Sequence, residues 1–246
     1  MSALPRVWLL GVALGAACHG GPRAALPELR DTDRGIAEAM ASFRRGDFSQ
    51  AAVAFRRLQF ELSPTQPEKA IVDYFLAECA FQTGDKETAA RDFQKVAEEY
   101  PASPYAPVAL LRAGDSHLRR WRAPELDAEA GQSALAVYQA LQGRYPGTAA
   151  AERAQQHIAQ LNDWFAEKAY RNGMFYLRRR AFDSAIIYFK DIIASYPNTR
   201  LVADALLRLV DSYRAIGYTV ELKEACANLR EYHPKTHGID RHCPPP

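Results

Sequence analysis

The sequence has few of the features that mark several protein classes. Four Cys in 246 residues are too few for a scaffold built on disulfides. A formal net charge of only +2 provides no strong field for nucleic acid, so we expect no nucleic-acid partner. β-branched residues are sparse, whereas Ala, Arg and Leu are abundant, and this composition favours helices. With 48% apolar and 24% charged residues, the chain is neither a disordered protein nor a polytopic membrane protein.

An uncharged apolar run near the N-terminus predicts export. It covers the eleven residues 7–17, whereas a membrane-spanning helix needs about 20. A short apolar run behind a single positive charge is typical of a secretory signal. The segment Leu14-Gly15-Ala16-Ala17-Cys18 resembles the lipobox of bacterial lipoproteins, which implies lipidation of Cys18. We expect a signal peptide over 1–17 and a flexible tether over 18–31, with cleavage by ordinary signal peptidase as the alternative.

A recurring spacing of Ala, an aromatic residue and Pro predicts repeated helices. Three segments end in Tyr-Pro, at Pro101, Pro146 and Pro197, and a related one runs into Pro64. In each, an Ala precedes an aromatic residue by four positions, and the pairs are Ala51–Phe55, Ala89–Phe93, Ala134–Tyr138 and Ala185–Phe189. Residues four apart share one helix face, and Pro ends a helix. Each segment therefore predicts a helix that packs through a small residue and a ring.

This spacing resembles the second helix of a tetratricopeptide repeat. The first helix of such a repeat carries a small residue twelve positions before the Ala, and Ala39, Ala77 and Gly173 fit that place. We expect an all-α fold, a right-handed α-solenoid of about five helical hairpins. Repeats 1–3 cover 32–147, and a long helix with repeats 4 and 5 covers 148–234. An unrelated all-α bundle is the alternative.

Two spacings exceed the usual 34 residues of the repeat. Pro101 and Pro146 lie 45 residues apart, and Pro146 and Pro197 lie 51 apart. The first surplus falls in 119–127 and predicts an enlarged connection between two helices. The second lies in a stretch without Pro from Thr148 to Arg179, which predicts one helix of about 30 residues.

The order of these features resembles the outer-membrane β-barrel assembly lipoprotein family (BamD, also called YfiO). The phrases that carry the resemblance are Phe43-Arg-Arg-Gly-Asp-Phe48, Tyr100-Pro-Ala-Ser-Pro-Tyr-Ala106, Trp164-Phe-Ala-Glu-Lys-Ala-Tyr170 and Tyr196-Pro-Asn-Thr199. The resemblance implies a non-catalytic scaffold without a cofactor, held on the periplasmic face of the outer membrane by acyl chains on Cys18. It implies that the C-terminal repeats bind the periplasmic domains of the barrel-forming insertase. The N-terminal repeats would receive unfolded outer-membrane proteins.

Other periplasmic repeat lipoproteins are the alternatives. A pilus-secretin pilotin usually has more uniform repeats than the spacings of 45 and 51 residues found here. A cell-envelope or division scaffold should carry an N-terminal coiled coil, for which residues 19–35 are too short and too rich in Pro and Gly.

Two sets of residues are candidate contacts. First helices line the concave face of such solenoids, and the groove-facing positions of the first two repeats hold Met40, Phe43, Tyr74 and Phe81. These side chains suit a terminal strand with aromatics, and packing in the core is the alternative. For the insertase, some family members carry a basic residue at a position that is Tyr188 here. Lys190 and Arg178 are the substitutes, so these three residues are the candidates.

The sequence contains no recognisable catalytic motif and no regular metal site. G-x-S-x-G, H-E-x-x-H and Walker A patterns do not occur, so we expect no enzyme. His157 lacks an obvious partner and is expected on the surface, whereas Cys79 is expected as a buried free thiol. Three His and Cys243 crowd the C-terminus, but Pro residues spoil ligand geometry there. We expect 235–246 to be disordered, with a metal site or a Cys226–Cys243 disulfide as alternatives.

Two short basic runs occupy predicted turns. Arg119-Arg120-Trp121-Arg122 and Arg178-Arg179-Arg180 are either solvated turns or contacts with an acidic partner or lipid headgroups.

Overall fold

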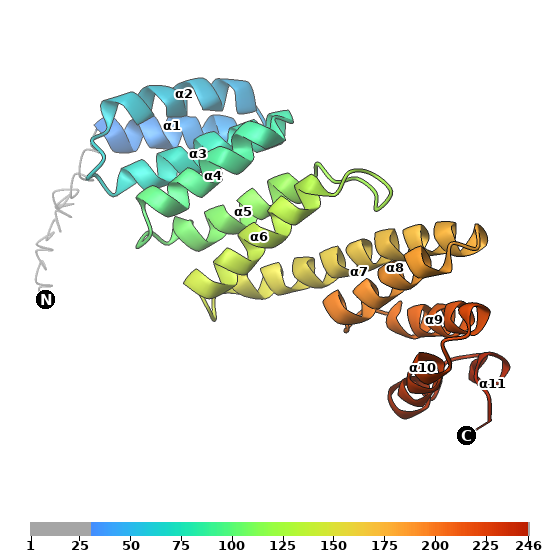
Figure 1. The fold of residues 1–246 in the computed structure, drawn as a ribbon. Helices are drawn as coiled ribbons and strands as arrows, with labels where there is room; N and C mark the ends of the chain where they lie inside the picture. The colour runs from blue at the N-terminus through green and yellow to red at the C-terminus, as the bar shows by residue number, and fades with distance from the viewer. Residues whose placement is uncertain (1–30, 246) are drawn as a thin grey trace, which may run out of the picture.

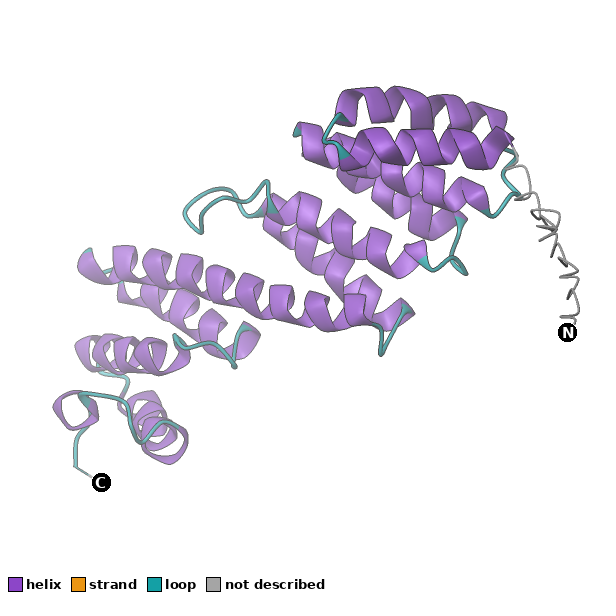
Figure 2. Ribbon diagram, turned by 180° about the vertical axis from the view of Figure 1, so that it is seen from behind, coloured by secondary structure: helices purple, strands orange, loops and turns teal. Residues whose placement is uncertain are grey.

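The computed structural model describes residues 31–245, and every regular element in that range is a helix (Figures 1 and 2). Consecutive helices pair as α1 (Asp31–Arg44) with α2 (Phe48–Glu61), α3 (Glu68–Thr83) with α4 (Lys86–Glu99), α5 (Tyr105–Leu118) with α6 (Glu129–Arg144), α7 (Ala149–Arg178) with α8 (Phe182–Ser195), and α9 (Val202–Ile216) with α10 (Thr219–Tyr232). A short α11 (Ile239–His242) follows. Each helix packs on the next, so the pairs stack in one row. The prediction of an α-solenoid of five helical pairs is confirmed.

The Ala and the ring predicted on one face of each second helix are buried between packed helices. The four Ala and four aromatic residues of the recurring pattern are all 0% exposed: Ala51, Phe55, Ala89, Phe93, Ala134, Tyr138, Ala185 and Phe189. A Cβ on Gly173 would lie 2.6 Å from the ring of Phe189, and one on Gly114 would overlap the ring of Tyr138. Glycine on the first helix therefore makes room for the ring of the second. The sequence spacing missed Gly114 because the enlarged connection shifts the count.

Two turns between paired helices contain the dipeptide Gly-Asp, at Gly46-Asp47 and Gly84-Asp85, but only one of the two Asp caps the helix that follows. Gly46 and Gly84 adopt positive φ angles of 84° and 99°, which glycine reaches without strain. The Asp85 carboxylate then accepts a hydrogen bond from the backbone N–H of Thr88 and caps α4. Asp47 makes no such cap, because its carboxylate instead accepts from Nε of Arg45 at 3.1 Å.

The two surplus segments form the predicted enlarged connection and long helix. α7 contains 30 residues, and the Thr148 hydroxyl caps it by accepting from the N–H of Ala151. The connection between α5 and α6 packs on this helix through Trp121, which is 1% exposed and lies 4.7 Å from Phe165 between ring centroids. Lys168 donates to the carbonyl of Leu126 at 2.7 Å. The insertion therefore ties the third repeat to α7.

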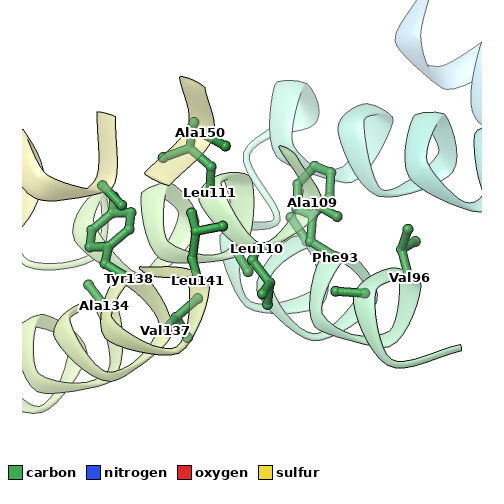
Figure 3. Close-up of a cluster of buried hydrophobic side chains, with 14 of the residues drawn as sticks. Phe93, Val96, Ala109, Leu110, Leu111, Ala134, Val137, Tyr138, Leu141 and Ala150 are labelled. Atoms are coloured by element: carbon green, nitrogen blue, oxygen red, sulfur yellow. The ribbon is translucent and has the colours of Figure 1, made fainter. Parts of the chain in front are cut away.

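The hydrophobic core divides inside α7. One cluster extends from α3 to the first half of α7 and ends at Phe165, and a second extends from Ala166 to Cys243. Figure 3 shows the middle of the first cluster, from Phe93 to Ala150. A smaller cluster joins α1, α2 and α3. Tyr196 packs against both large clusters and lies 6.0 Å from Phe165 between ring centroids. We predicted a boundary between an N-terminal part and a C-terminal part at residue 148, whereas the two large clusters meet at residues 165 and 166. The division into two parts at residue 148 stays a prediction.

The prediction of a disordered C-terminal tail is wrong. Cys226 and Cys243 form a disulfide, so the alternative pairing is confirmed. Ile239 and Cys243 are 8% and 5% exposed and pack against the last helical pair. Nδ1 of His242 lies 2.6 Å from the carboxylate of Asp211 on α9. One covalent bond and a buried apolar contact thus order a segment whose composition suggested disorder. No group of three metal-ligating side chains occurs among residues 31–245.

Gly173→Ala should destabilise the protein by about 1–3 kcal/mol, because the added Cβ would lie 2.6 Å from the Phe189 ring. Gly143→Ala in α6 is the matched control. A Cβ there meets nothing within 4 Å, so better helix propensity should stabilise the protein by up to about 1 kcal/mol. Urea unfolding followed by circular dichroism measures both. Equal midpoints for the two variants would contradict a close helix contact at Gly173.

Replacing both Cys226 and Cys243 by Ser should lower the free energy of unfolding by about 3 kcal/mol, because the crosslink joins residues 17 apart and limits the unfolded chain. Urea unfolding with and without reductant provides the measurement. The wild type in reductant should behave like the double variant. If oxidised wild type and double variant unfold at the same urea concentration, the crosslink contributes no stability.

Candidate protein-binding surfaces

The first helices of the pairs form the inner layer of the solenoid. α3 contacts α5 and α5 contacts α7, whereas successive second helices make no comparable contact among the described residues. A curved stack brings its elements closest on the concave side, so the first helices line that side. Three side chains of α5 and the C-cap residue after it are spaced three or four residues apart and share one face. We call these four residues the inner strip: Val108, Arg112, Asp115 and Arg119.

The structure places the four predicted groove residues mainly in the core. Tyr74 and Phe81 are only 8% and 5% exposed, so they offer almost no surface to a peptide. Met40 and Phe43 are half-buried against the cluster of the first repeat, and the Phe43 ring lies 5.2 Å from that of Phe75. For Tyr74 and Phe81, the alternative of core packing therefore describes the structure. Met40 and Phe43 keep partial access to solvent.

Charged side chains cover the aromatic residues instead. Both Nε and Nη2 of Arg112 donate to the carboxylate of Glu78, the latter at 2.8 Å. Nη1 of Arg112 also donates to Asp115 at 3.1 Å. Tyr74 and Tyr138 add hydroxyl donors to Glu78 and Asp115, at 3.2 and 2.8 Å. The inner face of repeats 2 and 3 therefore carries a polar network that links α3, α5 and α6.

The surroundings raise the pKa of three donors in this network, Tyr74, Arg112 and Tyr138. Burial is the main cause that raises the pKa of the Tyr138 hydroxyl, and the negative charge of Asp115 is the second. The hydroxyl therefore remains a neutral donor. Burial and the charge of Glu78 raise the pKa of Tyr74 in the same way. Burial alone would lower the pKa of Arg112, but the bonds to Glu78 raise it overall. Arg112 therefore stays charged at every pH at which the protein is folded.

His157 and Cys79 each have a structural environment. His157 was expected without a partner, but its ring stacks on Tyr138 at 5.2 Å and its Nε2 lies 3.5 Å from Asp115. Cys79 is a buried free thiol, as predicted. Burial raises its pKa to about 11, so the thiol is protonated and unreactive at neutral pH. The thiol borders an outer cavity of about 460 Å³ between α2, α3 and α4, whose walls carry charges of both signs.

The predicted insertase contacts lie on different parts of the fourth repeat. Arg178 is exposed at the end of α7, and Tyr188 is half-buried and stacks on Tyr176 at 5.5 Å. Lys190 lies on the rim of an outer groove of about 350 Å³ between α8, α9 and α10. Glu221 and Glu224 also line this groove, and its apolar lining includes Ile193, Leu206 and Leu209. The structure therefore associates Lys190 with a groove and separates it from Arg178.

No helix between residues 31 and 245 is long and apolar enough to cross a membrane. The predicted signal peptide, Cys18 and most of the tether lie outside the described residues, so lipidation stays a prediction.

Curated proteins with similar sequences are assembly factors. Outer membrane protein assembly factor BamD of Caulobacter vibrioides is 32% identical over 130 residues, which cover 53% of this chain and 43% of that protein. The protein of the same name from Xylella fastidiosa strain 9a5c is 25% identical over 192 residues, which cover 73% of this chain and 65% of that protein. The chain thus spans less than two thirds of the length of these relatives.

Solved structures of tetratricopeptide proteins also align with the chain. The alignment with the TPR2AB domain of yeast Sti1, in its complex with pHSP90, covers 83% of this chain and 78% of that chain, with 14% identity and a TM-score of 0.42. The family model YfiO, described as outer membrane lipoprotein, matches residues 34–229, which extend from within α1 to within α10 and so reach all five helical pairs. The resemblance seen in the sequence is confirmed, and the chain belongs to the YfiO family of outer membrane lipoproteins.

Proposed function

We propose that this protein is a non-catalytic scaffold of outer-membrane β-barrel assembly that binds two protein partners. The match of the YfiO family over residues 34–229 carries the proposal, and relatives named as assembly factors support it. The partners would be the periplasmic domains of the barrel-forming insertase and unfolded outer-membrane proteins. Acyl chains on Cys18 would hold the scaffold at the membrane.

The inner strip supports a role for the N-terminal repeats in binding unfolded chains. Val108 is an apolar side chain 37% exposed on a first helix, with Arg112 one turn along. Half-buried Met40 and Phe43 add apolar surface on the first repeat. An extended segment with alternating apolar and polar side chains fits a surface on which apolar and charged groups lie side by side. Tyr74 and Phe81 would support this surface from beneath.

The outer groove of the last two pairs supports a site for the insertase. Lys190 lies on one rim, and two Glu of α10 contribute the opposite charge. Such an arrangement favours a partner segment with an apolar face and charges of both signs. Because the groove lies in the last two pairs and the inner strip on the third pair, the two partners could bind together. Arg178 and Tyr188 would extend the contact surface beyond the groove.

Val108→Asp should weaken the binding of an unfolded outer-membrane protein segment about tenfold, because a charge replaces an apolar contact on the inner strip. Val53→Asp on α2 is the matched control, since Val53 is 67% exposed on a second helix. Fluorescence anisotropy with a labelled segment measures the affinity, after circular dichroism shows both variants folded. Equal losses in the two variants would contradict binding on the inner face.

Lys190→Glu should weaken binding of the insertase's periplasmic domain about tenfold, because the reversed charge would face Glu221 and Glu224 across the groove. Lys95→Glu on α4 is the control, since this side chain is 62% exposed on the second helix of another repeat. Biolayer interferometry with the purified domain provides dissociation constants. Unchanged affinity of the Lys190 variant would exclude the groove as the contact.

A further inference from the structure

The turn between α7 and α8 has an arginine where other turns have a glycine. Helix α7 ends in a Schellman motif, in which the N–H of Ala181 donates to the carbonyl of Tyr176 at 3.0 Å. Arg180 occupies the left-handed position of this motif with a φ angle of 62°, and among residues 31–245 no other residue except glycine has a positive φ. The turns after α1, α3 and α9 have a glycine with positive φ: Gly46, Gly84 and Gly217.

The side chain of Arg180 has no partner among residues 31–245 that would account for this conformation. A left-handed backbone brings the Cβ of an L-residue close to a carbonyl oxygen, which glycine avoids. Within that range, the side chains of Arg178, Arg179 and Arg180 make no hydrogen bond or ion pair, and all three are exposed. Rarely populated backbone conformations cluster at functional sites, so the arginine indicates a contact outside the chain.

An exposed aromatic ring lies beside these arginines. Phe175, near the end of α7, is 42% exposed. Cζ of Arg179 lies 3.6 Å from the centroid of the Phe175 ring, so the guanidinium rests on this ring in a cation–π contact. We call Phe175, Arg179 and Arg180 the basic turn. It presents an apolar surface and two positive charges where α7 ends and α8 begins (Figure 1).

The combination of arginine with an exposed ring fits the surface of a membrane. Anionic headgroups attract Lys and Arg that lie close to them, and Phe beside basic residues is typical of segments that rest in the headgroup layer. Consecutive side chains on a turn point in several directions, which suits many phosphates in one plane better than a single carboxylate. The chain belongs to a family of outer membrane lipoproteins, so such phosphates are close at hand.

We propose that the basic turn binds the anionic headgroups of membrane phospholipids. Arg179 and Arg180 donate to phosphate oxygens, and the ring of Phe175 enters the headgroup layer. An acyl anchor on Cys18 holds the chain near its N-terminus, whereas the basic turn orients the fourth repeat towards the membrane. The membrane location is part of the proposed function, so this inference rests on it.

The first test measures the binding of residues 19–246 to phosphatidylcholine vesicles with and without phosphatidylglycerol. This chain contains every described helix but lacks Cys18, so acyl chains contribute nothing to binding. Sedimentation should show binding to the vesicles that contain phosphatidylglycerol, and added salt should weaken it. Equal binding to both kinds of vesicle, or to neither, would overturn the inference.

Arg179→Gln combined with Arg180→Gly should weaken this vesicle binding about tenfold, because two charges leave the basic turn. Arg57→Gln combined with Lys95→Gln is the matched control. It removes the same charge from α2 and α4, where the two side chains are 81% and 62% exposed and pair with carboxylates of their own helices. The control should bind like the wild type, and circular dichroism should show both variants folded. Equal losses would assign binding to net charge and overturn the inference.

Arg180→Gly alone separates lipid binding from stability. Glycine adopts a φ of 62° without strain, so the urea midpoint should rise while the affinity for phosphatidylglycerol vesicles falls. A structural role for the arginine side chain predicts a lower midpoint instead. A higher midpoint with unchanged vesicle binding would also contradict a lipid contact at Arg180.

Phe175→Ser should weaken vesicle binding several-fold, because the ring no longer enters the headgroup layer. Phe60→Ser is its control, since it removes a ring that is 83% exposed on α2. This control should bind vesicles like the wild type. Equal losses in the two variants would remove the ring of Phe175 from the lipid contact and overturn the basic turn as defined.

Binding of the insertase's periplasmic domain separates this inference from the proposed function. The Arg179 and Arg180 double variant should retain the domain, because the groove at Lys190 is unchanged. If that variant loses the domain and keeps the vesicles, the basic turn is a protein contact, which overturns the inference and leaves the proposed function standing. If the wild type binds vesicles through the basic turn but does not bind the domain, the lipid contact stands and the proposed function fails.

Discussion

The contact between a ring on the second helix and a small residue on the first sets the geometry of this protein. Tyr138 and Phe189 are fully buried, and the space they occupy exists only because Gly114 and Gly173 have no Cβ. Burial of one such ring contributes about 2–3 kcal/mol. A single pair still exposes an apolar face, which becomes buried only when neighbouring pairs stack on it. In the last pair Cys226 replaces the ring. There the disulfide to Cys243 and the buried Ile239 close the end of the stack.

Close packing of the first helices explains why the inner face is polar. Large aromatic side chains such as Tyr74 and Phe81 fill the space between α3 and its neighbours, so they become core rather than surface. The charged side chains beside them on α3 and α5 are Glu78, which is buried, and Arg112 and Asp115, which are half-buried, and they satisfy one another. A buried charge is costly unless it is paired, and this network meets that condition. Where this network ends, Lys86 and Arg119 have no carboxylate partner among residues 31–245.

The long helix α7 determines how the two halves are held. Its 30 residues extend for about 45 Å and contribute to both large hydrophobic clusters. Trp121 packs against its middle from the third repeat, and Tyr196 packs there from the fourth. Contacts from both sides make the helix a shared core element instead of a linker. The inner strip and the outer groove are therefore held at a fixed distance, which suits a scaffold with two partners.

The sequence by itself determined the five helical pairs, the long helix and the enlarged connection. Those features follow from short-range rules: Ala and a ring four residues apart share a face, Gly ends a helix, and Pro prevents its continuation. Only the tertiary structure decided which side chains face the groove. Tyr74 and Phe81 fit a groove position by spacing, but their burial depends on α5 packing across α3, and Arg112 reaches Glu78 from 34 residues away. The same holds for the ordered tail, because His242 and Asp211 meet only after α11 folds back onto α9. Spacing along one helix determines a face, whereas exposure is set by the neighbouring helices that cover it.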